Sequence, residues 1–241
     1  MLYICVMNFL DKKQIEEAWK TEWNTAMALR ITIVLITAAL FLIFVPSFLL
    51  YIQHRQGIQL NDRILALLPS ADLSWLIFPI IHVSIFIALA NLIHYPRLLL
   101  VAMESYLVVS FLRMLAIYLF PMEPPQGLVI LTDHVNEDLF YSNTVITKDL
   151  FFSGHTTTIF ILYLAVRNPL LKALFLCLTV VIAVMLLIQH IHYSIDIAGA
   201  LFFTWASYYV VLTLDKKFSA SLLRHKVNPS GILEHSEQYN S

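Results

Sequence analysis

Two histidine-containing segments in the second half of the sequence have the residue types and spacing of a phosphoryl-transfer site. His192 and Asp196 are four residues apart, so on a helix their side chains share a face and can meet. A carboxylate bonded to one imidazole nitrogen fixes the tautomer and leaves the other nitrogen nucleophilic. His155 follows Ser153 and Gly154 where the chain turns into a helix, and the backbone N–H groups of such a start bind phosphate. Together these residues predict a histidine nucleophile beside a bound phosphate.

A further cation completes the expected chemistry. Arg113 lies late in the third apolar segment and offers a fixed positive charge suited to phosphate oxygens. We therefore expect phosphoryl transfer through a phosphohistidine on His192, with Asp196 orienting the ring and His155 protonating the leaving oxygen. Ionisable residues in apolar segments are costly, so a functional role is the default interpretation. The alternative for Arg113 is a side chain that extends to the lipid headgroups without touching substrate.

The elements that must position these residues are membrane helices, as the composition indicates. Of the 241 residues, 59% are apolar and 13% are charged, and the mean hydropathy is +0.77. Soluble domains carry about 25% charged residues. Six nearly uncharged windows of the sequence have the length of about 18–25 residues that a helix needs to cross a bilayer. The expected fold class is all-α, a bundle of six transmembrane helices, and the net charge of −1 excludes a strongly basic nucleic-acid binder.

The expected spans divide the chain into a catalytic membrane domain, residues 29–215, between an N-terminal segment, 1–28, and a tail, 216–241. The six spans lie at about 29–52, 73–93, 98–120, 150–166, 170–188 and 192–214. Residues 10–24 predict an amphipathic helix on the membrane surface, because apolar residues recur there at helical spacing among charges. These apolar residues are Leu10, Ile15, Trp19 and Trp23.

The basic residues predict that both termini are cytoplasmic. With the N-terminus inside, 11 of the 15 Lys and Arg residues fall in inner segments and three in outer segments, while Arg113 lies within a span. Cytoplasmic segments of membrane proteins carry such an excess. Arg113, His155, His192 and Asp196 then share a depth near the outer, non-cytoplasmic face, although they come from three different spans. We expect the active site to open there.

The sequence around these residues resembles a known family. The segments Asp149–Thr156 and His192–Asp196 look like the two catalytic motifs of the sphingomyelin synthase-like branch of the type 2 phosphatidic acid phosphatase superfamily. The segment Phe111–Tyr118 looks like the third, weaker motif of that family. The resemblance covers about residues 105–212 and extends to the six-span layout.

This resemblance implies roles for individual residues. It implies His192 as the nucleophile, Asp196 as its orienting partner and His155 as the general acid and base. It also implies that no metal or other cofactor takes part, and that the partners are phospholipid and lipid-alcohol substrates with no nucleic acid. The sequence carries no signal for the oligomeric state.

Departures from the family pattern bear on the reaction. The broader superfamily has a Lys-x6-Arg-Pro signature that is absent near the third span, and a Ser-Arg pair where Met185 and Leu186 stand here. With two phosphate-binding cations missing, a phosphomonoester dianion is poorly neutralised, whereas a diester carries one charge. This favours transfer of a phospho-headgroup from a phospholipid to a ceramide-like or other lipid alcohol. The Cys-Gly that the branch has before the aspartate is replaced by Thr147 and Lys148, so the headgroup stays open.

Two other functions stay open. If water is the acceptor, the same residues form a lipid phosphate phosphatase that hydrolyses phosphatidate or a polyprenyl (pyro)phosphate. A chain without catalysis would be a lipid-binding or scaffolding membrane protein, and the presence of His155, His192 and Asp196 argues against this reading.

The remaining candidate substrate-binding residues have simpler alternatives. Asp149 could cap the following helix instead of contacting a headgroup, and Ser153 and Thr156 could bond only to backbone near the helix start, where Gly154 also lies. Two further intramembrane polar residues, His82 and Glu104, could pair between helices, and structural roles are expected for both. The acidic residues of the long loop after the third span could attract a cationic headgroup or simply be solvated. These residues are Glu123, Asp133, Glu137 and Asp138.

Overall fold

The computed structural model describes residues 11–130 and 145–227, and within these ranges the chain forms helices and loops without a strand. The helices are α2 (Lys12–Glu22), α3 (Thr25–Gln53), α4 (Ser74–Leu92), α5 (Pro96–Leu119), α7 (Gly154–Ala165), α8 (Pro169–Ile188) and α9 (Ser194–Val227), with a short 3₁₀ helix, η1, at Leu65–Leu67. The predicted all-α fold class is confirmed. α9 continues beyond residue 214, where the last span was expected to end.

Five helices are long and apolar enough to cross a bilayer: α3, α4, α5, α8 and the Ser194–Phe218 part of α9. They indicate an integral membrane protein. The predicted span at 150–166 is wrong in length, because it forms only the 12-residue helix α7. Phe151 and Phe152 continue the apolar pattern but precede the helix, and Ser153 caps it by accepting the N–H of Thr156 at 3.3 Å. A helix of this length rises about 18 Å, against about 30 Å of hydrocarbon.

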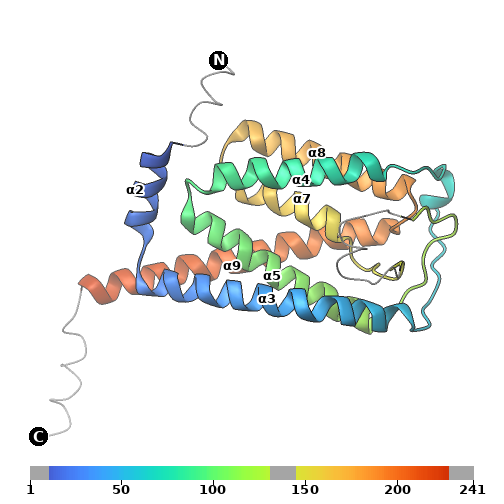
Figure 1. Ribbon diagram of the computed structural model, residues 1–241, viewed down its shortest axis with the longest axis horizontal. Coiled ribbons are helices and arrows are strands. Elements are labelled where there is room, and N and C mark those ends of the chain that lie inside the picture. The colour runs from blue at the N-terminus through green and yellow to red at the C-terminus, as the bar shows by residue number, and fades with distance from the viewer. Residues whose placement is uncertain (1–10, 131–144, 228–241) are drawn as a thin grey trace, which may run out of the picture.

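The short helix α7 lies in the middle of the bundle (Figure 1), where it contacts α4, α5, α8 and α9. Its apolar residues Ile159, Ile161, Leu162 and Ala165 belong to the main core that these helices share. α3 packs mainly against α5 at the edge of the bundle and exposes most of its apolar side chains, as a lipid-facing helix does. The helix that carries His155 is therefore enclosed by protein on several sides.

The predicted surface helix at 10–24 forms as α2, which lies across one end of the bundle (Figure 1). Asp11 caps it by accepting the N–H of Lys13 at 3.0 Å, and none of its residues is fully buried. Trp19 donates its indole Nε1–H to the carbonyl oxygen of Ile93 at 3.0 Å, which ties α2 to the α4–α5 turn. Leu10, the first residue of the predicted helix, lies outside the described residues.

At the same end of the bundle, a charged network joins α3, α5 and α9. Arg30 donates to both carboxylate oxygens of Glu104, at 2.8 and 2.6 Å, and to Asp215 at 2.7 Å. Arg97 donates to the other oxygen of Asp215 at 2.6 Å. The interhelical pairing suggested for Glu104 is thus confirmed. Within the described ranges His82 does not form one, and its exposed ring bonds the carbonyl oxygen of Phe78 one turn earlier in its own helix.

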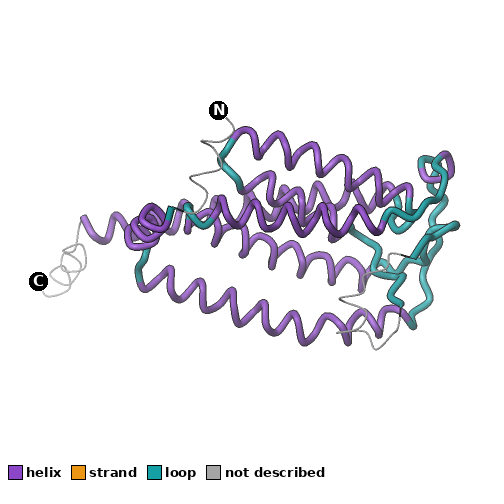
Figure 2. Tube along the Cα trace, turned by 45° about the horizontal axis from the view of Figure 1, so that its top comes forward, coloured by secondary structure: helices purple, strands orange, loops and turns teal. Residues whose placement is uncertain are grey.

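The opposite end carries the loops that precede α4, α7 and α9, drawn in teal in Figure 2. Two of these loops pair through their backbones, since Ile58 donates to Pro121 O at 3.0 Å and Glu123 donates to Ile58 O at 3.1 Å. A Cβ on Gly57 would lie 2.6 Å from the carbonyl carbon of Met122, so this close approach requires glycine. Lys148 Nζ lies 2.8 Å from Glu123 Oε1 and brings in the segment before α7. The other acidic loop residues, Asp133, Glu137 and Asp138, lie outside the described residues.

Candidate active site

His192 and Asp196 are in contact and almost completely buried. His192 Nδ1 lies 3.2 Å from Asp196 Oδ2, and the two residues are 2% and 0% exposed. The pairing was predicted, but the expectation that both lie on the helix is wrong, because α9 begins at Ser194 and His192 stands in the bend before it. Asp196 is the third residue of α9 and reaches back to the helix start. Its Oδ2 also accepts the N–H of Tyr193 at 2.9 Å, which is half of a capping box.

This contact defines the state of the imidazole ring. Because Asp196 can only accept, the proton of a neutral His192 is assigned to Nδ1 and the lone pair to Nε2. The ring is held at one edge by a buried carboxylate and at the backbone by the helix start. Such an arrangement suits a nitrogen nucleophile whose orientation is set by its partner.

Asp62, a residue that the sequence analysis did not single out, fixes the start of α9 from a distant loop. Its Oδ2 accepts the N–H of Ser194 at 2.6 Å, while Oδ1 accepts those of Ile64 and Leu65 at 3.0 and 3.2 Å. Burial raises the pKa of Asp62, but the bonds from Ser194, Leu65 and Ile64 outweigh it and hold the pKa below its usual value. An Asp just before a short apolar turn is a typical capping signal. The contact with Ser194 has no such local signal, because 132 residues separate the partners.

Arg113 reaches from α5 to the start of α7. Its Nε donates to the carbonyl oxygen of Phe152 at 2.7 Å, and its Nη2 forms an ion pair with Asp149 Oδ1 at 2.6 Å. The guanidinium also lies against Gly154, where an added Cβ would stand 3.2 Å from Arg113 Cζ. Asp149 therefore pairs with Arg113, and the capping alternative belongs to Ser153 instead.

The two histidine motifs are joined directly. Ser153 donates its backbone N–H to the carbonyl oxygen of Asp196 at 3.2 Å. Next to this bond, the rings of Phe152 and Phe203 stack with centroids 4.9 Å apart, so the start of α7 packs on the first turns of α9. The partly exposed ring of His155 lies edge-on to Phe78 of α4, with centroids 6.0 Å apart. Residues of α4, α5, α7 and α9 thus meet at one end of the bundle, α4 being an addition to the three spans expected to form the site.

Thr156 is buried, and its hydroxyl has no hydrogen-bond partner in the described part of the chain. In a helix, a threonine hydroxyl usually donates to the carbonyl four residues earlier, as Thr158 does to Gly154 at 2.9 Å. For Thr156 that carbonyl belongs to Phe152 and already accepts from Arg113. The alternative in which Thr156 bonds only backbone through its side chain is therefore wrong for the described residues. The Thr156 hydroxyl therefore has a donor available for an oxygen atom of a ligand.

The two positions at which the superfamily has Ser-Arg lie on the buried side of α8. Met185 and Leu186 are 8% and 0% exposed and belong to the main apolar core. A cation at position 186 would be buried among aliphatic side chains. The packing of α8 therefore disfavours a phosphate-binding cation at this position. The positive charge that the described residues bring against the α7 start comes from Arg113, and Asp149 already offsets part of it.

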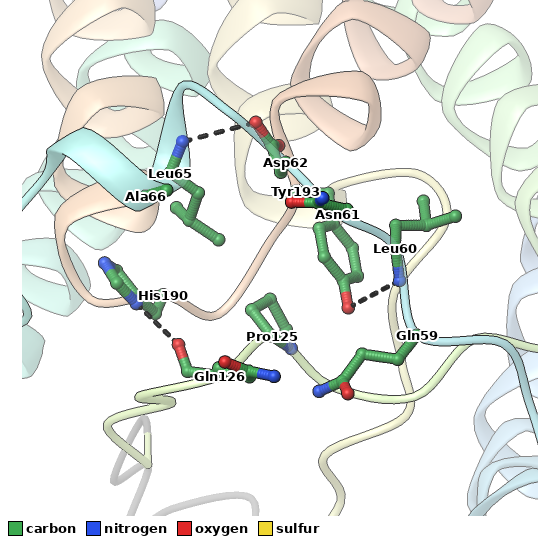
Figure 3. A pocket seen from close by; sticks show the side chains of 10 residues that line it. All are labelled: Gln59, Leu60, Asn61, Asp62, Leu65, Ala66, Pro125, Gln126, His190 and Tyr193. Carbon is green, nitrogen blue, oxygen red and sulfur yellow. Dashed lines mark hydrogen bonds between the residues drawn. The ribbon is translucent and has the colours of Figure 1, made fainter.

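A pocket of about 430 Å³ lies beside the bend before α9 that carries His190 and Tyr193 (Figure 3). It is lined by Gln59, Leu60, Asn61, Asp62, Leu65, Ala66, Pro125, Gln126, His190 and Tyr193. The Tyr193 hydroxyl donates to Glu123 O at 2.9 Å and accepts the N–H of Leu60 at 3.3 Å. His190 lies with Nδ1 2.8 Å from Gln126 O and Nε2 3.2 Å from Leu68 O. The backbone on both sides of His192 is therefore fastened to two other loops.

Comparison with known proteins gives a family for the part of the chain that holds both histidines. Residues 148–213 match the family model described as PAP2 superfamily C-terminal. This match supports the type 2 phosphatidic acid phosphatase superfamily, whose members act as phosphatases or phosphotransferases, and does not single out the sphingomyelin synthase-like branch. None of the curated proteins matches the chain significantly.

Proposed function

From the match of residues 148–213 to the PAP2 superfamily, we propose that this membrane protein is a lipid phosphotransferase that works through a phosphohistidine on His192. The observation that carries the proposal is the buried contact between His192 Nδ1 and Asp196 Oδ2 at 3.2 Å, which leaves Nε2 as the nucleophile. A phospholipid is the donor, and a ceramide-like or other lipid alcohol is the acceptor. The domain between residues 29 and 215 carries the activity.

In the first half-reaction, His192 Nε2 attacks the phosphorus of the donor phosphodiester. The bond from phosphorus to the oxygen of the diacylglycerol breaks, and His155 gives that oxygen its proton. Asp196 stabilises the positive charge that develops on the imidazole ring. Arg113, the Thr156 hydroxyl and the N–H groups at the start of α7, around Gly154, bind the phosphate oxygens.

In the second half-reaction, the hydroxyl oxygen of the acceptor attacks the phosphorus of the phosphohistidine. His155, now neutral, takes the hydroxyl proton, and the bond between phosphorus and His192 Nε2 breaks. Both histidines return to their starting protonation states. With water as the acceptor, the same steps would release a phosphorylated headgroup and regenerate the enzyme.

The charge balance supports a diester substrate. Arg113 is ion-paired with Asp149 at 2.6 Å, and the positions at which the superfamily has Ser-Arg hold the buried Met185 and Leu186. A phosphomonoester brings up to two negative charges and a phosphodiester one. Removing an uncompensated charge from water is costly, so a site with little net positive charge favours the diester.

The proposed orientation puts this site at the outer face, with both termini in the cytoplasm. It is supported by the 11 basic residues that fall on the inner side, against three on the outer side. The donor and acceptor lipids would then both come from the outer leaflet.

The direct test is a headgroup-transfer assay. Purified protein is incubated with headgroup-labelled phosphatidylcholine or phosphatidylethanolamine, with and without ceramide, and the lipid products are separated. We expect labelled phospho-ceramide to form with the wild-type protein and to be lost in His192→Ala. His82→Ala is the matched control, because that exposed ring bonds only a carbonyl of its own helix among the described residues.

The covalent intermediate provides an independent readout. A donor labelled at phosphorus should leave an acid-labile, base-stable label on the wild-type protein and on His82→Ala, but not on His192→Ala. Release of free phosphate from phosphatidate with no headgroup transfer would replace the transferase by the phosphatase. Full activity of His192→Ala on any lipid would overturn the assignment of the nucleophile.

A further inference from the structure

A cavity of about 580 Å³ lies at the end of the bundle opposite the candidate active site. Its walls come from α2, the start of α5, the α7–α8 turn and the distal part of α9. Figure 1 shows α2 lying across this end of the bundle. Asp215 in this cavity is 19 residues along α9 from Asp196, a helical distance of about 28 Å. The cavity is therefore separate from the site of phosphoryl transfer.

The charged side chains of this cavity are arranged for an anion. Three cations line it, Arg97, Arg167 and Lys216, against two carboxylates, Glu22 and Asp215. Asp215 has no oxygen left for a ligand cation, because Arg97 and Arg30 bind its two carboxylate oxygens at 2.6 and 2.7 Å. The net charge of the side chains that line the cavity is therefore positive.

Two of the cations have their donors available. Arg167 is exposed and lies over the ring of Tyr95, with its Cζ 5.6 Å from the ring centroid, and it makes no hydrogen bond within the described ranges. A cation–π contact uses none of the hydrogen-bond donors of the guanidinium, so these N–H groups are available to oxygen acceptors. Lys216 is also exposed and makes no ion pair with a described residue.

The start of α5 at the same cavity points the same way. α5 begins at Pro96 without any side-chain cap, so its first N–H groups are not satisfied by a neighbouring side chain. Pro96 lines the cavity. An uncapped start of a 24-residue helix next to three cations is a favourable place for a phosphate.

We propose that this cavity binds the phosphate of an anionic ligand, either the headgroup of an acidic phospholipid in the adjacent leaflet or a soluble phosphate ester. The site is held together by α2, which Trp19 fastens above it, and by the Arg97–Asp215 pair. Arg167 and Lys216 contact the phosphate, and the start of α5 lies beneath it. This site does not depend on the proposed transferase activity.

The test measures binding of dioctanoyl phosphatidylglycerol to the full-length protein in detergent, by native mass spectrometry and by thermal shift. Dioctanoyl phosphatidylcholine is the zwitterionic comparison, and inorganic phosphate and glycerol 3-phosphate are the soluble probes. A near-surface cation contributes about fivefold to the binding of an anionic headgroup. We expect the double variant Arg167→Gln, Lys216→Gln to raise the apparent Kd for phosphatidylglycerol about 25-fold.

The matched control is Lys172→Gln, Lys217→Gln, which removes two charges near the same end from residues that do not line the cavity. It should leave the Kd within about twofold of wild type, as expected for surface charges outside the site. Saturable binding of phosphatidylglycerol alone identifies a lipid headgroup, and equal protection by the soluble probes identifies a phosphate ester. Equal losses in both double variants, or no preference for phosphatidylglycerol over phosphatidylcholine, would overturn the proposal. All four substituted side chains are solvent-exposed or half-exposed, so unliganded stability should be unchanged.

Discussion

The backbone N–H of Ser153 donates to the carbonyl oxygen of Asp196 at 3.2 Å, across 43 residues of sequence. This bond joins the residue that caps α7 to the residue that orients His192. The proposed acid, His155, and the proposed nucleophile therefore belong to one hydrogen-bonded unit. A change at either helix start is expected to be transmitted to the other.

Asp196→Asn is expected to lower the rate of lipid turnover by about two to four orders of magnitude while leaving the fold intact. The amide oxygen can still accept from Tyr193, but the negative charge that supports the imidazolium and its tautomer is gone. Single-turnover rates and thermal unfolding in detergent, compared with Asp72→Asn in a neighbouring loop, measure both effects. A turnover rate within twofold of wild type would remove Asp196 from the proposed mechanism.

Thr156→Val and Thr157→Val form a matched pair on adjacent residues of α7. The hydroxyl of Thr156 has no partner among the described residues, so its removal should not lower stability but should reduce activity by roughly 10- to 100-fold if it binds the phosphate. Thr157 bonds Thr204 at 3.2 Å between Oγ1 atoms, so its loss should cost about 1–2 kcal/mol of stability.

Steady-state kinetics and thermal unfolding of the two variants separate these outcomes. The expected pattern is loss of activity without loss of stability in one variant and the reverse in the other. If Thr156→Val instead lost stability at full activity, its hydroxyl would have a structural role.

Gly154→Ala is expected to reduce kcat/KM by roughly three- to tenfold through Arg113. The new Cβ would stand 3.2 Å from Arg113 Cζ and 3.3 Å from Nη2, so the guanidinium must shift by a few tenths of an ångström. Alanine is the better helix former, so reduced helix propensity cannot explain a loss. Measured kinetics at the wild-type level would show that the position of Arg113 is not critical.

Glu104→Gln should destabilise the protein by roughly 1–3 kcal/mol, because it removes a two-point, charge-assisted contact with Arg30 inside the bundle. Glu16→Gln is the control, since its ion pair with Lys20 on α2 is mostly exposed and should contribute little. Thermal unfolding in the same detergent compares the two. Equal losses of stability in the two variants would show that the contact between Glu104 and Arg30 contributes no more than an exposed ion pair.

Acidification should destabilise the loops around His192. The side-chain bond from Lys148 lowers the pKa of Glu123, and burial of Asp62 is outweighed by the bonds from Ser194, Leu65 and Ile64, so its pKa is lowered too. A carboxyl group whose folded pKa is lowered stabilises the fold above its unfolded pKa, and this contribution is lost as the pH falls through the folded value.

The unfolding temperature should therefore decrease when the pH is lowered beyond about 4, where free Asp and Glu side chains become protonated. Asp62→Asn should lower the unfolding temperature at neutral pH and weaken its dependence on pH in the acidic range. A pH profile identical to that of wild type would show that Asp62 makes no linked contribution.

The sequence predicts the membrane helices well where apolar length and the surrounding polar residues agree, as in α3 and α8. It fails at 150–166, because Phe151 and Phe152 look like span residues although they lie before the cap at Ser153. Hydropathy counts side chains and does not register where a helix begins, so a short buried helix and a full span have similar averages.

The contacts of the candidate site could likewise be predicted only in part from the sequence. The pairing of His192 with Asp196 follows from a spacing of four, even though the bend before α9 and not the helix provides it. The contact of Asp62 with Ser194 and the position of Arg113 against Gly154 depend on how distant segments pack. Contacts of that kind have no local pattern in a single sequence.

The 12-residue length of α7 has a consequence for how a lipid reaches the site. About 18 Å of helix covers little more than half of the hydrocarbon thickness, and the non-helical segment ahead of it is tolerated at membrane depth only inside protein. If the start of α7 binds phosphate as proposed and is the end that falls short, the phosphate site would be recessed below the level of the surrounding headgroups. A lipid in this site would sink its headgroup into the protein while its acyl chains stay in the bilayer, so turnover avoids the free-energy cost of drawing the lipid out.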